Sequence, residues 1–128
     1  MIWKILFILA GWGYFIFEGI TEGFATQGEQ FTQKANQDWY HKMRLCENIG
    51  LVIAFHIVFI VLKAYAWIPL FWLTTTSGLS LYEFAFSRVK YGNWLHTKTS
   101  LWLGIKHPKG WVWIVVFCIS LVLLLIIL

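Results

Sequence analysis

Charged residues, cysteines and prolines are all scarce in this chain. Of its 128 residues, 12% are charged, two are cysteines and two are prolines, whereas a soluble domain carries about 25% charged residues. Cys46 and Cys118 match neither a metal-binding spacing nor a disulfide framework. No Asn-x-Ser/Thr glycosylation sequence occurs. This composition excludes a disordered chain, a nucleic-acid-binding tail and an ordinary cytosolic enzyme.

Apolar and aromatic residues take the place of the missing charge. Hydrophobic residues make up 59% of the chain and aromatic residues 20%, with nine tryptophans. A soluble domain of this size leaves a large fraction of its surface in water and could not bury so much apolar area. Lipid is therefore the expected solvent, and we expect an integral membrane protein.

Four apolar stretches predict an all-α membrane protein with four transmembrane helices packed as two hairpins in a single domain, 1–128. The helices are expected at about 2–23, 39–64, 69–87 and 110–128. The first, second and fourth supply the roughly 20 apolar residues that a span needs. Hydroxyl residues from Thr74 to Ser80 interrupt the third. This third segment either spans with the help of neighbouring helices or re-enters the membrane, and we favour a span.

Basic residues set the expected orientation. Eight of the ten lie in or beside the two long connections, and the other two are Lys4 and Lys63. The eight are Lys34, Lys42, Arg44, Arg88, Lys90, Lys98, Lys106 and Lys109. The positive-inside rule then predicts cytoplasmic long loops, both termini on the opposite side, and the inner or cytoplasmic membrane as location. Anionic lipid headgroups at the cytoplasmic face are the expected partners of this charge, and no nucleic-acid partner is expected.

The second helix carries a polar seam along one face. Its members fall within an arc of about 80° on a helical wheel. They are Asp38, Asn48, His56 and Lys63, with His41 on the same arc. Such a seam must face other helices or a water-filled cavity. Asp38 and Lys63 can reach the interface by snorkelling, whereas His56 is either a hydrogen-bonded structural residue or a functional one.

Acidic residues and histidines are expected to converge at the loop end of the bundle. The set is Glu18, Glu22, His41, Glu83 and His107. Carboxylates and imidazoles gathered in a helical bundle can hold Fe, Mn or Zn, although no Glu-x-x-His pair is present. The competing interpretation is an ion-pair network in which Arg44, Lys42 or Arg88 neutralises these carboxylates or Glu47.

Gly19 and Gly23 form a small-xxx-small pair in the first helix. Glycines at this spacing allow two membrane helices to approach closely. The pair therefore predicts a helix–helix contact on that face.

Three functions remain open. The favoured one is a non-catalytic membrane subunit or assembly protein, in a homo-oligomer or a larger membrane complex, with internally paired polar residues. The second is a membrane metal-binding protein or metalloenzyme that uses the Glu/His set. The third is an oligomeric channel, transporter or holin-like pore lined by the second helix. No sequence motif decides whether the protein is an enzyme.

Overall fold

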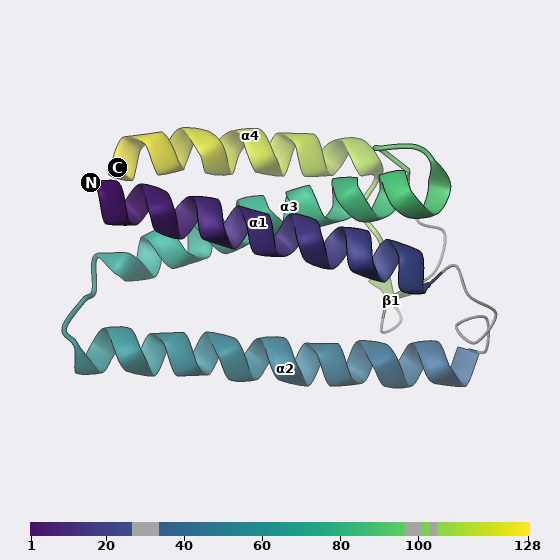
Figure 1. The fold of residues 1–128 in the computed structure, drawn as a ribbon, viewed down its shortest axis with the longest axis horizontal. Coiled ribbons are helices and arrows are strands. Elements are labelled where there is room, and N and C mark those ends of the chain that lie inside the picture. Colours follow the sequence, from purple (N-terminus) through teal and green to yellow (C-terminus); the bar gives the residue numbers. More distant parts are fainter. Residues whose placement is uncertain (27–33, 97–100, 103–104) are drawn as a thin grey trace.

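A computed structural model describes residues 1–26, 34–96, 101–102 and 105–128, and the side chains of 1–26, 42–96 and 107–128. The elements are α1 (Ile2–Ala25), α2 (Lys34–Val61), α3 (Trp67–Tyr91), β1 (Leu101–Trp102), β2 (Ile105–Lys106) and α4 (Gly110–Ile127) (Figure 1). The two short strands pair antiparallel, Leu101 opposite Lys106. Apart from them, the regular structure of the described chain is helical, which confirms the all-α class.

Three helices are long and apolar enough to cross a membrane: α1, the segment Lys42–Val61 of α2, and α4. Large apolar side chains are exposed along all three, among them Leu9 at 54%, Ile57 at 56% and Ile119 at 56%. Exposed apolar surface of this extent indicates lipid as the surrounding solvent. The fourth predicted span, α3, is long enough but is not among these apolar helices.

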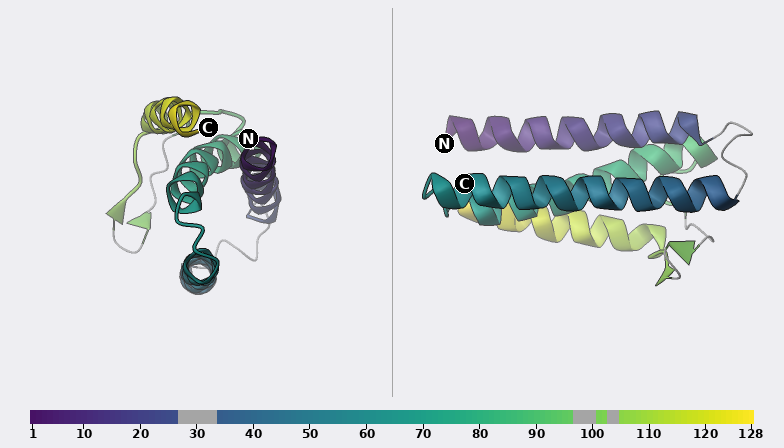
Figure 2. Two further views of the ribbon diagram at one scale, coloured as in Figure 1. Left: turned by 90° about the vertical axis from the view of Figure 1, so that its left-hand side faces the viewer. Right: turned by 90° about the horizontal axis from the view of Figure 1, so that it is seen from below.

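Helix α3 occupies the centre of the bundle, with α1 and α4 packed against it, while α2 stands apart (Figures 1 and 2). Among the described side chains of α2, Phe59 alone is buried. The two predicted hairpins are not confirmed, because α1 packs mainly against α3 and not against α2. Both termini lie at one end of the bundle (Figure 1), where Lys4 Nζ donates to the carbonyl of Ile127 (3.0 Å).

Four hydroxyl residues of α3 face protein and not lipid. Thr74, Ser77, Ser80 and Ser87 are all at most 3% exposed, because α1 and α4 cover the helix. The Ser77 hydroxyl donates to the carbonyl of Leu73 (2.8 Å), as hydroxyls within helices commonly do. The low hydropathy of this segment therefore reflects its central position in the bundle.

Helices α1 and α3 run in the same direction and meet through small residues. Their contacts advance by four residues on both helices together. The pairs are Gly11 with Thr74, Phe15 with Gly78, Gly19 with Tyr82, and Gly23 with Phe86. A Cβ atom on Gly19 would lie 2.5 Å from the backbone oxygen of Tyr82, so the two backbones touch directly. The close contact predicted for Gly19 and Gly23 is confirmed.

The turn between α2 and α3 begins with Lys63 in the left-handed region (φ 52°). The Lys63 amide donates to Ile60 (3.0 Å), and the Ala64 amide donates to Phe59 (2.7 Å). This is a Schellman cap in which lysine holds the position usually taken by glycine. The second helix therefore ends at Val61, earlier than the predicted 64, and Lys63 lies beyond it.

Candidate functional site

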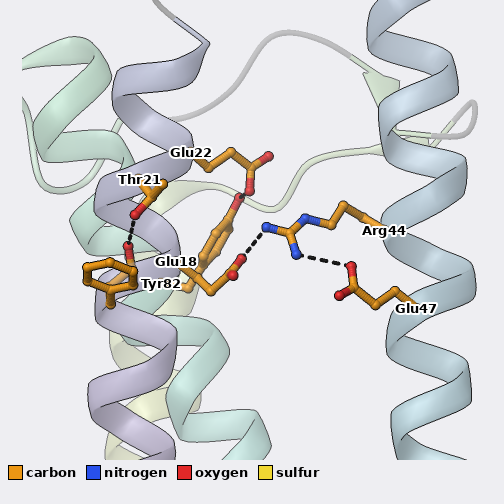
Figure 3. A network of polar contacts seen from close by, with 7 residues as sticks. Glu18, Thr21, Glu22, Arg44, Glu47 and Tyr82 are labelled. Atoms are coloured by element: carbon orange, nitrogen blue, oxygen red, sulfur yellow. Dashed lines mark hydrogen bonds and ion pairs between the residues drawn. The ribbon is translucent and has the colours of Figure 1, made fainter.

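An ion-pair network joins α1 and α2 near the loop end (Figure 3). Arg44 of α2 reaches Glu18 of α1 with one terminal guanidinium nitrogen. Its other terminal nitrogen lies 3.1 Å from Glu47 Oε2. One cation thus serves two carboxylates, and the predicted ion-pair network involving Arg44 is confirmed. The ion pair with Arg44 matters most for Glu18, because an unpaired carboxylate at membrane depth is costly.

Glu22 has a separate partner. The hydroxyl of Tyr82, on α3, donates to the Glu22 carboxylate (Figure 3). The Tyr82 ring stacks on Phe86 with a centroid distance of 5.9 Å and an interplanar angle of 18°. Since Tyr82 also packs against Gly19, the close approach of α1 and α3 brings this phenol to Glu22.

The candidate metal ligands are engaged in these and other contacts. Glu18 pairs with Arg44 and Glu22 with Tyr82, while Glu83 and His107 each interact elsewhere. Within residues 1–26, 42–96 and 107–128, no group of three or more His, Cys, Asp or Glu side chains could hold a metal ion. The fifth candidate, His41, has a side chain outside the described residues, as does the seam residue Asp38. Fe, Mn or Zn binding therefore stays a hypothesis without support from the described side chains.

His56 is hydrogen-bonded through both ring nitrogens. Nδ1 lies 2.7 Å from the carbonyl of Val52, and Trp72 Nε1 donates to Nε2 (3.0 Å). An indole N–H can only donate, so Nε2 must accept and the proton must sit on Nδ1. This pattern describes a neutral imidazole that joins α2 to α3. It matches the structural alternative for His56.

The other seam positions differ from His56. Asn48 is exposed, and Lys63 lies in the turn after α2. Beside His56, Phe55 and Phe59 pack against Phe71 of α3, with ring centroids 5.1 and 6.1 Å apart. The described α2–α3 contact is thus an aromatic cluster with one hydrogen bond.

Sequence reasoning missed the aromatic partners of these polar groups. Trp12 Nε1 donates to Ser77 Oγ (2.7 Å) at the α1–α3 interface, and Trp72 and Tyr82 act similarly on His56 and Glu22. The indole N–H and the phenol O–H could have predicted that such partners exist, because a tryptophan or tyrosine away from water needs a hydrogen-bond partner. The partner itself could not be identified from spacing along the chain.

These polar side chains mostly satisfy one another and leave no open ligand set in the described chain. Thr74 Oγ1 is the single buried side-chain oxygen or nitrogen without a partner among the described residues. Comparison with protein-family models, with curated proteins and with solved structures found no match. Function must therefore be inferred from the contacts within the chain.

Proposed function

We propose that the protein is a non-catalytic integral membrane subunit or assembly protein that binds its partner through α2. The observation that carries the proposal is the internal pairing of polar groups: Arg44 with Glu18 and Glu47, and His56 with Trp72. A bundle whose polar groups bind one another is suited to a structural role.

The surface of α2 supports the same proposal. Most of its described apolar side chains are exposed, including Leu51 at 45%, Ile53 at 54% and Ile60 at 53%. Gly50 has no atom within 4 Å of the position of a Cβ, so a neighbouring helix could approach closely there. The occupant is either a second copy of the chain or another membrane protein.

The topology within the membrane belongs to the same proposal. With 25 residues and about 1.5 Å rise per residue, α3 exceeds the roughly 30 Å hydrocarbon core and would span as the fourth helix. The basic loops would lie in the cytoplasm and both termini on the other side. Fusing a reporter active on only one side of the membrane to each terminus and to the 87–110 connection tests this orientation.

The decisive experiment measures assembly, metal and flux on one preparation of the full chain. Chemical cross-linking in native membranes should yield a discrete complex larger than the 15.0 kDa monomer. The purified protein should hold no stoichiometric Fe, Mn or Zn, and reconstituted liposomes should leak no faster than protein-free ones. A monomer that forms no cross-linked complex overturns the proposal.

Two variants make the other functions visible. Metal that is stoichiometric in wild type and absent from Glu22→Gln/His41→Ala would replace the proposal with a metalloprotein. Ion flux that disappears in His56→Leu would replace it with a pore. Circular dichroism of each variant checks that the helices are retained.

A further inference from the structure

Basic residues accumulate at the C-terminal end of α3 and beyond. Arg88 and Lys90 lie in the last turn of the helix. Glu83 is the last acidic residue of the sequence, and five basic residues follow it. Charge of one sign at the end of a membrane bundle attracts the opposite charge from the membrane surface.

The fold gathers two of these cations and two tryptophans into one corner. The Arg88 guanidinium carbon lies 5.8 Å from the ring centroid of Trp94. The carbonyl group of the next residue, Leu95, lies directly against Gly110. A Cβ atom added to Gly110 would overlap this carbonyl group. Gly110 is buried and is flanked in the sequence by Lys109 and Trp111, so this backbone contact brings the segment after α3 that holds Trp94 next to the start of α4 (Figure 1).

The corner combines charge with amphipathic rings. Trp94 is 57% exposed and Trp111 58%, and both Arg88 and Lys109 are exposed. Tryptophan prefers the headgroup level of a bilayer, where its ring meets acyl chains and its N–H meets water. Arg88 donates to the carbonyl of Gly92, but a guanidinium has five N–H donors and retains others for a phosphate.

The residues that follow Arg88 in the sequence add no acidic side chain. The Tyr91 ring stacks on His96 with centroids 3.9 Å apart, and Glu83 is the nearest acidic residue before them in the sequence.

We infer that Arg88, Trp94, Lys109 and Trp111 form a binding site for the phosphate headgroup of an anionic glycerophospholipid. Arg88 and Lys109 hold the phosphate, while Trp94 and Trp111 lie against the glycerol and the upper acyl chains. The site rests on the proposed membrane placement, with this end at a leaflet surface, and it is independent of any protein partner.

Native mass spectrometry of the purified chain tests the site. The protein is mixed with equal amounts of phosphatidylglycerol and phosphatidylcholine at low salt, and the retained lipids are counted. Wild type should retain phosphatidylglycerol preferentially. Each basic side chain near a membrane surface contributes about five-fold to such binding, so Arg88→Gln/Lys109→Gln should lose about 25-fold.

The matched control removes the same charge at the opposite end. Lys4→Gln/Lys63→Gln lowers the net charge equally and should keep the preference, and thermal unfolding checks that each variant is folded. No preference in wild type, or equal losses in both double variants, overturns the site whatever the variants' stability. Inorganic phosphate should not displace the lipid at equal concentration, and displacement would mean a soluble phosphate site instead.

These outcomes are distinct from those that test the subunit role. A chain that forms a complex in membranes but shows no lipid preference retains the proposed function and loses the lipid site. A chain that prefers phosphatidylglycerol but stays monomeric retains the lipid site and loses the partner.

Discussion

Replacing Gly19 with alanine should separate α1 from α3. The added Cβ would lie 2.5 Å from the Tyr82 carbonyl oxygen, about 0.9 Å inside ordinary van der Waals contact. It would also lie 3.2 Å from Ala85 Cβ and 3.2 Å from the Phe86 amide nitrogen. Because two of these three atoms belong to the backbone of α3, no side-chain rotation relieves the overlap and the helices must move apart. Overpacking of this kind costs about 1–3 kcal/mol.

Gly13→Ala is the control for this substitution. It lies on the same helix, and nothing approaches within 4 Å of its Cβ position. Alanine is the better helix former by about 1 kcal/mol in water, so Gly13→Ala should be neutral or stabilising. The difference between the two variants then measures the overlap at Gly19.

Unfolding in mixed micelles, with the mole fraction of sodium dodecyl sulfate raised stepwise, gives the two free energies. Circular dichroism follows loss of helix, and tryptophan fluorescence follows loss of packing. Gly11→Ala should cost less than Gly19→Ala, since its Cβ meets only the Thr74 methyl group, 2.7 Å away, which can rotate. If Gly19→Ala and Gly13→Ala unfold within about 0.5 kcal/mol of each other, the direct backbone contact between α1 and α3 is refuted.

Three further predictions use the same unfolding assay. Lys63→Gly should stabilise the protein by about 1 kcal/mol, because Lys63 is in the left-handed conformation (φ 52°), which glycine adopts without the strain that other residues incur. A destabilised variant would contradict the Schellman cap at the end of α2. Ser77→Ala should cost about 1–3 kcal/mol, because it leaves the N–H of the half-buried Trp12 without its acceptor. Trp12→Phe in that background should cost less than it does in wild type. Arg44→Met should lower the free energy of unfolding less when Glu18 is also changed to glutamine, with a coupling energy of about 1 kcal/mol between the two substitutions. If the effects of the two substitutions are strictly additive, the ion pair contributes nothing to stability.

Composition and periodicity predicted the first and fourth helices closely. The first was expected at 2–23 and runs Ile2–Ala25, and the fourth was expected at 110–128 and runs Gly110–Ile127. These boundaries follow from local properties, the length of each apolar run and the charge beside it. Gly92, which closes α3 in the left-handed conformation (φ 71°), is such a local signal.

The candidate site was predictable only in part. Charge pattern alone placed Arg44 among the cations able to neutralise Glu18, and the ion pair formed. It could not choose between Arg44 and Lys42, since that choice depends on the distance between two helices. For His56, sequence reasoning left two alternatives, and the N–H of Trp72 from another helix favours one of them.

The sequence by itself determined the membrane class, the four helices and the glycine pair at Gly19 and Gly23, because each depends on residues close together in the chain. Only the tertiary structure decided that this pair meets α3, and that α3 is the central helix. The hydroxyls from Thr74 to Ser80 lower hydropathy in the same way whether lipid or protein surrounds them. Which of the two surrounds them depends on the position of helices distant in sequence, and that position puts Ser77 and Ser80 at 0% exposure.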